Sequence, residues 1–143
     1  MSRYIIFALL LVFSCSNKKS NDLIDTFFNK FEDQGSNEAI DFLFSSNKLI
    51  EPISIEIVDL KKNLSSTVKV LGTYYGHELL SVYEVTDNLI HYTYLVRFEQ
   101  QPLRFTFTIY RPKDKWQIQN FTFDYHILEE LNESSKLNNL KID

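Results

Sequence analysis

Residue types that could catalyse a reaction or bind a metal are few in this chain and widely spaced. The three histidines, His77, His91 and His126, lie too far apart to suggest a metal site, and neither a His-Glu-x-x-His motif nor an Asp-rich calcium loop occurs. The three glycines form no loop that could hold a phosphate, and no nucleophile motif of the Gly-x-Ser-x-Gly type is present. We therefore expect neither a metal ion nor a cofactor.

The chain has one cysteine, Cys15, and its surroundings suggest a covalent modification. A basic start with Arg3 precedes residues 4–13, which are uncharged and mostly aliphatic or aromatic. This length is typical of a signal peptide and too short to span a bilayer. Residues 12–15, Val-Phe-Ser-Cys, resemble the bacterial lipobox, in which an aliphatic residue lies three positions before the cysteine and a small residue directly before it. We expect lipid on the Cys15 thiol.

A lipidated Cys15 would make the protein a lipoprotein of the bacterial cell envelope. Residues 1–14 are then the signal peptide, and residues 15–20 are the lipidated cysteine and a polar tether. Acyl chains anchor a protein to a membrane because each buried methylene contributes about 0.8 kcal/mol. Ser16 after the cysteine favours the outer membrane, and the leaflet is left undecided. The alternative is an ordinary cleaved signal peptide followed by a chance cysteine.

Composition argues for one globular domain that does not bind nucleic acid. The length of 143 residues allows one domain with a substantial core, and 24% charged residues is ordinary for a globular chain. The formal net charge is −4, and no cluster of Lys or Arg breaks the acidic balance. Binding to a phosphate backbone is therefore not expected.

Hydrophobic periodicity predicts helices first and strands afterwards. Apolar residues recur at helical spacing up to about residue 71, and from Gly76 onward they alternate with a period of two. The stretch 52–71 is ambiguous, and its longer helical stripe decides in favour of a helix that begins at Pro52. The predicted helices cover residues 21–33, 37–45 and 52–70, and the predicted strands cover residues 77–86, 89–100, 103–111 and 115–126.

Short polar connections between the strands predict an antiparallel meander. A change of phase in the last strand implies a bulge near Gln119 and Asn120. Residues 127–131 are expected to add a last helical turn, and residues 132–143 to form a frayed tail. The predicted fold class is α+β, with three N-terminal helices packed on a bent four-stranded antiparallel meander sheet.

Three motifs within residues 21–131 resemble the nuclear transport factor 2-like superfamily, in particular its small envelope-associated members. One motif lies on the second predicted helix, one leads into the sheet, and one lies at the last hairpin: Ala39-x-x-Phe42-Leu43, Leu71-Gly72-x-Tyr74-x-Gly76 and Tyr110-x-Pro112-x-Asp114-x-Trp116. The resemblance implies a bent sheet that wraps around its helices as a cone. It implies a fold more than a function, because the superfamily contains enzymes and many non-catalytic modules.

The resemblance also implies where a pocket would lie. Enzymes of the superfamily place an acidic residue, or an Asp with a His, in the cone beside tyrosines, and the candidates here are Glu78, Tyr92, Tyr94, Asp124 and His126. We expect a small aromatic cavity near the end of the third helix that could hold an apolar ligand, lined by Glu78, Tyr92, Tyr94, Trp116 and Tyr125. A fully packed cone with tyrosine hydroxyls at its rim is the alternative.

Two classes of function remain. The preferred one is a non-catalytic module, anchored to the membrane, that binds an apolar ligand in the cone or a protein on the outer face of the sheet. The outer-face candidates, which would also support a weak homodimer, are Leu95, Thr106, Thr108 and Tyr110. The alternative is a small isomerase-like or dehydratase-like enzyme that uses general acid–base chemistry in the same cone.

Overall fold

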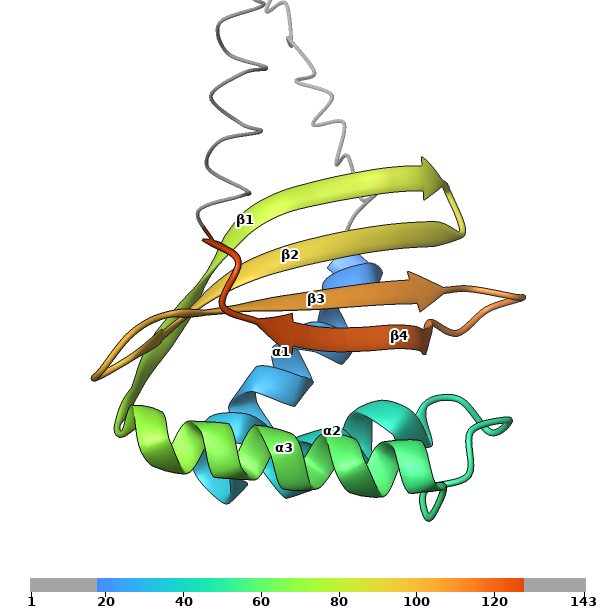
Figure 1. Ribbon diagram of the computed structural model, residues 1–143. Helices are drawn as coiled ribbons and strands as arrows, with labels where there is room; N and C mark the ends of the chain where they lie inside the picture. Colours follow the sequence, from blue (N-terminus) through green and yellow to red (C-terminus); the bar gives the residue numbers. More distant parts are fainter. Residues whose placement is uncertain (1–17, 128–143) are drawn as a thin grey trace, which may run out of the picture.

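The computed structural model describes residues 18–127. The predictions for the signal peptide, Cys15, the first part of the tether and the tail after Ile127 fall outside these residues. The first helix begins at Lys18 and not at residue 21, so the prediction that residues 18–20 belong to the tether is wrong. The order of elements is three helices and then four strands, as expected for the α+β class (Figure 1). The elements are α1 (Lys18–Gln34), α2 (Ser36–Ser45), α3 (Ile55–Leu71), β1 (Tyr74–Thr86), β2 (Leu89–Phe98), β3 (Leu103–Tyr110) and β4 (Gln117–Asp124).

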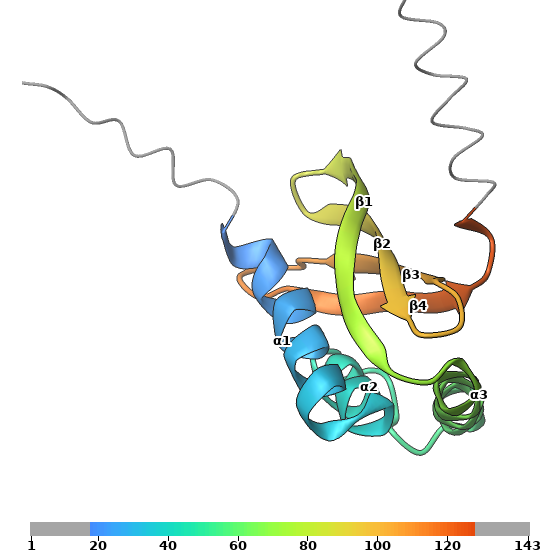
Figure 2. The same cartoon turned by 90° about the vertical axis from the view of Figure 1, so that its left-hand side faces the viewer.

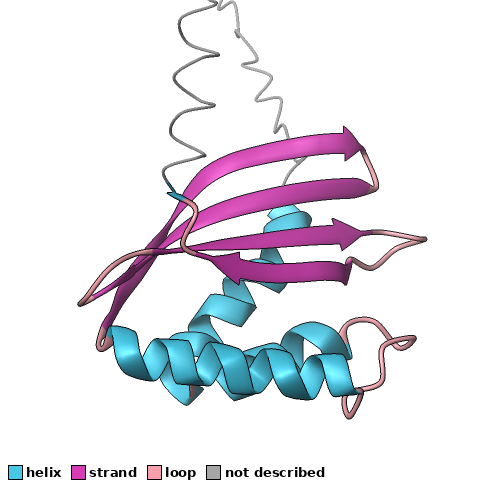
Figure 3. Cartoon of the chain, in the orientation of Figure 1, coloured by secondary structure: helices cyan, strands magenta, loops and turns pink. Residues whose placement is uncertain are grey.

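The four strands form one antiparallel sheet in the order β1-β2-β3-β4, so β1 and β4 are its two edges (Figure 3). The predicted bulge in the last strand is confirmed. Thr108 pairs with Asn120, but its neighbour Ile109 pairs with Ile118, which leaves Gln119 as the extra residue of β4. Such a bulge bends a strand and strengthens its twist.

The third helix begins three residues later than predicted. Ser54 has an extended backbone conformation, and its side chain accepts a hydrogen bond from the backbone N–H of Ile57 at 3.4 Å. A serine in this position is a favourable N-cap because it satisfies a donor that has no partner within the helix. The prediction that Pro52 starts the helix is therefore wrong, and Ser54 sets the start.

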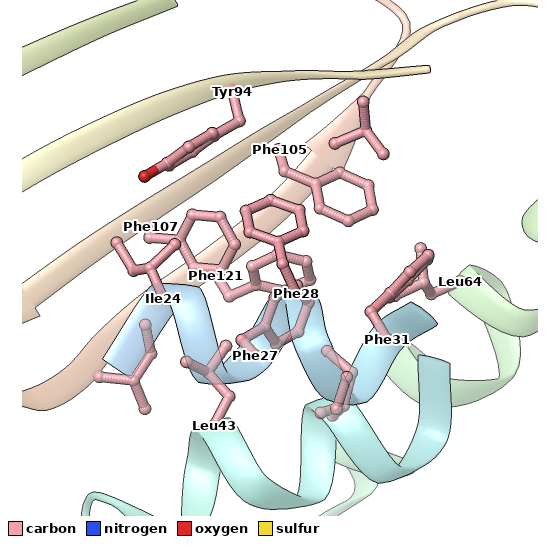
Figure 4. Packing of buried hydrophobic residues seen from close by; sticks show 14 of the residues in the cluster. Ile24, Phe27, Phe28, Phe31, Leu43, Leu64, Tyr94, Phe105, Phe107 and Phe121 are labelled. Carbon is pink, nitrogen blue, oxygen red and sulfur yellow. The ribbon is translucent and has the colours of Figure 1, made fainter. Parts of the chain in front are cut away.

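The core lies between α1 and one face of the sheet, which we name the inner face. Phe27 of α1 is fully buried, and its ring lies 5.1 Å from the ring of Phe107 and 5.4 Å from that of Phe121, measured between centroids. Figure 4 shows these rings together with Phe28 and Phe105 between the helix and the strands. Aromatic pairs at such distances stabilise the fold beyond the area that they bury.

The other helices lie on the same side of the sheet as α1. α2 contacts α1 and β4, and α3 contacts α2. In Figure 2 α2 and α3 lie below the sheet, α1 runs obliquely up beside it, and the hairpin that joins β1 and β2 extends beyond all three. The helices therefore leave the hairpin end of β1 uncovered.

The edge formed by β4 is covered from within the chain. The buried side chain of Asn47, just after α2, donates a hydrogen bond from Nδ2 to the carbonyl oxygen of Ile118 at 2.8 Å. The Ser46 hydroxyl oxygen accepts a hydrogen bond from the backbone N–H of Ile118 at 3.0 Å. Both backbone groups of this β4 residue are therefore hydrogen-bonded on the side that faces away from β3.

Candidate functional site

The most unusual surface of the described residues is the hairpin half of β1, residues 79–86, which we name the exposed segment. All of its residues are exposed, although the segment is paired with β2 in the sheet (Figure 1). Its large hydrophobic side chains retain between 39% and 67% of their accessible surface: Leu79 48%, Leu80 39%, Val82 42%, Tyr83 67% and Val85 49%. Contiguous exposed apolar side chains of this kind mark interaction surfaces in folded proteins.

Both faces of the sheet contribute to the exposed segment. Leu79 and Val82 pair with Tyr94 and Tyr92 of β2, whose side chains face the helices, so they belong to the inner face. Tyr83 pairs with His91 and belongs to the outer face. The segment is therefore a protruding apolar edge with two sides.

Three register shifts along β1 explain why its side chains do not alternate simply. In each shift two residues of β1 lie opposite one residue of β2, and the extra residues are Tyr75, Leu80 and Val85. Each extra residue reverses the alternation of faces that follows it. The shift at Tyr75 places His77, and not Glu78, on the inner face.

His77 lies where the packed part of β1 meets the exposed segment. Its imidazole stacks on the ring of Phe28 at 3.6 Å between centroids, and Nδ1 is 2.8 Å from the hydroxyl oxygen of Tyr74. Burial lowers the pKa of His77 below its usual value of 6.5, with a smaller contribution from Arg97, and the carboxylates of Asp25 and Glu32 oppose this effect. His77 is thus a packed residue that favours its neutral form.

Tyr92 and Tyr94 lie on the inner face, as expected from the alternation of β2, and both are buried. The Tyr94 ring packs against Phe28 at 5.1 Å and against Phe107 at 5.8 Å between centroids (Figure 4). Burial raises the pKa of Tyr94 to about 12, with smaller contributions from Asp25 and Tyr92. Near neutral pH the Tyr94 hydroxyl therefore stays protonated and can donate a hydrogen bond but cannot act as a base.

The other predicted pocket residues do not join these two tyrosines. Glu78 is exposed on the outer face and forms an ion pair with Arg97 at 3.2 Å. Trp116 lies before β4, where the guanidinium of Arg111 sits 4.9 Å from the centre of its ring. Tyr125 follows β4 and is 50% exposed. The five residues are spread over both faces and both ends of the sheet.

The predicted outer-face residues form a partly exposed polar surface whose groups bond to one another. The hydroxyls of Thr106 and Thr122 are hydrogen-bonded, and Thr108 is bonded to the imidazole of His91 at 2.9 Å. Leu95 is half-buried, and Tyr110 is 38% exposed at the end of β3. Few polar groups of this surface are therefore left to recognise a partner by hydrogen bonding.

An ion pair completes this outer surface, with Arg104 Nη2 3.0 Å from Asp124 Oδ2. Burial, the strongest single influence, would raise the pKa of Asp124. The hydrogen bonds from Arg104 and from the backbone N–H of His126, together with the charges of these two residues, outweigh it and lower the pKa below its usual range.

Two surface hollows lie away from the inner-face tyrosines. One, of about 600 Å³, is on the outer face and is lined by Tyr75, Leu95, Arg97, Phe98 and Pro102. The guanidinium of Arg97 in this hollow already donates a hydrogen bond to the carbonyl oxygen of Tyr75 and forms an ion pair with Glu78. The other, of about 380 Å³, lies between the loop after α2 and the loop before β4. Neither hollow is lined by Tyr92 or Tyr94.

Within residues 18–127, no group of three or more His, Cys, Asp or Glu side chains is placed to hold a metal ion. The helices of this same part of the chain are too short or too polar to cross a membrane.

Comparison of the chain with family models, with curated protein sequences and with solved structures found no match. The geometry of the described residues therefore carries the functional argument.

The exposed segment does not follow from a strict alternation of faces along β1. The adjacent leucines Leu79 and Leu80 interrupt strict alternation. This interruption is the sequence feature that could have predicted a bulged strand with apolar residues on both faces.

Proposed function

We propose that this protein is a lipid-anchored component of the bacterial cell envelope whose domain is a non-catalytic binding module. The exposed segment of β1 is the surface that contacts a protein partner. The observation that carries this proposal is the set of five large hydrophobic side chains at 39–67% exposure on an edge strand. Edge strands of monomeric proteins are usually protected by charge, proline or covering elements.

The fold is consistent with such a module. Three helices followed by a meander with a bulged last strand is the arrangement that the resemblance to the nuclear transport factor 2-like superfamily implies. In this proposal the inner face near α1 serves stability, because Phe27, Phe28 and Phe107 pack there. Binding is then the role of the strand that the helices leave uncovered.

The anchor belongs to the same proposal. Lipid on Cys15 would hold the domain close to the membrane, because only residues 16 and 17 separate Cys15 from the start of α1 at Lys18, with the outer membrane favoured. Metabolic labelling with an alkynyl fatty acid tests this directly. The chain should incorporate label, and Cys15→Ser should not; equal labelling of the two would contradict the anchor.

An acid–base enzyme is the second candidate, and the hydrogen bond between Tyr74 and His77 is the observation in its favour. Burial raises the pKa of Tyr74 to about 12, with a smaller contribution from Glu32 that exceeds the opposing effect of Arg97. A tyrosine that holds its proton so strongly is a poor acid at neutral pH. The separation of Glu78 from Tyr92 and Tyr94 also removes the pair that such a mechanism would need.

Photocrosslinking in intact cells tests the binding surface. A photoreactive benzoylphenylalanine replaces Tyr83 in the exposed segment, and in a matched control it replaces Tyr125, which is exposed but lies after β4. We expect a discrete crosslinked protein product from position 83 and none from position 125. No product from position 83, or products from position 125 alone, would contradict the proposed surface.

A further inference from the structure

We infer that the partner bound by the exposed segment is a second copy of this chain, paired antiparallel with it through β1. This inference rests on the proposed function, because it names the protein that the exposed segment contacts. Its basis is a symmetry in the irregularities of β1.

The bulges of β1 are arranged symmetrically about a point between Leu80 and Ser81. The pairs of residues that share one β2 partner are 75–76, 80–81 and 85–86. Reversing the direction of the strand about this point exchanges the first pair with the last and maps the middle pair onto itself. An antiparallel copy of β1 therefore places bulge opposite bulge, with two residues facing two at each irregular position.

The same reversal keeps the two faces of the sheet aligned. Each inner-face residue of one copy lies opposite an inner-face residue of the other: His77 opposite Glu84, and Leu79 opposite Val82. The outer-face residues match in the same way, with Tyr83 opposite Glu78. A two-fold axis repeats every one of these pairs, as an isologous interface requires.

Side-chain chemistry supports this register. The pairing of Leu79 with Val82 of the second copy occurs twice and would cover side chains that are 48% and 42% exposed in one chain. Opposed apolar pairs of this kind stabilise antiparallel strands, whereas like charges directly opposite destabilise them.

Other registers satisfy fewer of these conditions. A register shifted by five residues toward the start of β1, with the axis at Glu78, also matches bulges, but it places Glu78 opposite Glu78 of the second copy. A register shifted by five residues toward the hairpin, with the axis at Tyr83, shortens the ladder to residues 80–86. Of these three registers, only the one centred between Leu80 and Ser81 pairs residues 75–86 and keeps the Glu78 carboxylates of the two copies apart.

The bulges also select against other strands. Bulges locally disrupt the hydrogen-bond ladder and increase the twist of an edge strand, which is how they protect edges from indiscriminate pairing. A reversed copy of β1 has the same spacing. A two-fold pairing uses the β1 edge of both copies, so the assembly closes at two copies.

Disulfide crosslinking of the full chain in its native membrane tests this register. One tagged copy carries Leu79→Cys and a second, differently tagged copy carries Val82→Cys, and both are expressed together and oxidised. We expect a mixed dimer that contains both tags. The matched control, Leu79→Cys in both copies, should lose this product because the two cysteines then lie several residues apart along the paired strands. The unsubstituted chain, oxidised alongside, accounts for any link through Cys15.

The outcomes separate this inference from the proposed function. Equal crosslinking in the control pair would overturn the β1 register. Crosslinking of Tyr110→Cys copies, with none between positions 79 and 82, would also overturn it and would favour the outer face as the interface. If position 83 captures a different protein and the cysteine pair does not link, the second copy is the wrong partner but the binding surface stands. If position 83 captures nothing, both fail. Should the cysteine variants not accumulate, a position-83 product that contains both tags still supports the inference, and a complete lack of mixed-tag products overturns it.

Discussion

The two edges of this sheet are finished in different ways. At β4, the side chains of Ser46 and Asn47 bond to both backbone groups of Ile118, and α2 lies against the strand. At β1, the helices end short of the hairpin, and residues 79–86 stay exposed on both faces. The β4 edge is covered at Ile118 within the chain, whereas the β1 edge retains exposed apolar surface.

The burial of one inner-face side chain from each edge strand shows the same difference between the two edges. Phe121 of β4 is 4% exposed and contacts the rings of Phe27 and Phe107, whereas Val82 of β1 is 42% exposed. Both residues lie on the inner face of an edge strand. Their surroundings, and not their position in the sheet, decide whether they stabilise the domain.

The largest expected effect is therefore a contrast between these two residues. Phe121→Ala should lower the free energy of unfolding by about 3–5 kcal/mol, because it removes a buried ring and leaves a cavity. Val82→Ala, the matched change at the other edge, should lower it by less than about 1 kcal/mol. Urea unfolding of the purified protein measures both. Similar losses for the two variants would mean that the β1 edge belongs to the core.

The cover of the β4 edge has a smaller expected effect. Asn47→Ala should destabilise the protein by about 1–3 kcal/mol, since it leaves the buried carbonyl of Ile118 and the N–H of Leu49 without their Asn47 partners. Asn63→Ala at an exposed position of α3 is the control and should change little. An Asn47 variant as stable as the control would show that this edge does not need its cover.

The smallest effect concerns His77, at the boundary between the packed and exposed parts of β1. Because its folded-state pKa lies below 6.5, the unfolded chain binds a proton more readily. This contribution to stability is fully present above about pH 6.5 and decreases as the pH falls toward the lowered pKa. His77→Gln should reduce the dependence of unfolding free energy on pH between 7.5 and 5.5. An unchanged dependence would place the boundary elsewhere along β1.

Local pattern was enough to predict the elements and the inner face of β2 and β3. Helical spacing indicated α1 through Phe27, Phe28 and Phe31, and alternation indicated which residues of β3 are buried, such as Phe105 and Phe107. These signals are local because each side chain packs on the face that its own period selects.

The candidate site could not be predicted in the same way. Alternation shows which residues share a face, but whether that face is covered depends on how far the helices reach. Bulges add a second difficulty, because the extra residue Tyr75 turns Glu78 to the outer face while Tyr92 and Tyr94 stay inside. The predicted grouping of Glu78 with these tyrosines assumed a regular strand.

The central claim is that the exposed segment is available for binding and is not needed for folding. The double variant Leu79→Asp, Val82→Asp, with benzoylphenylalanine at position 83, tests both parts in one protein. Its melting temperature should stay within about 4 °C of the parent chain, since a change of 1 kcal/mol corresponds to a few degrees, and the crosslinked product should disappear. A protein that unfolds, or one that keeps its crosslink, would contradict the account.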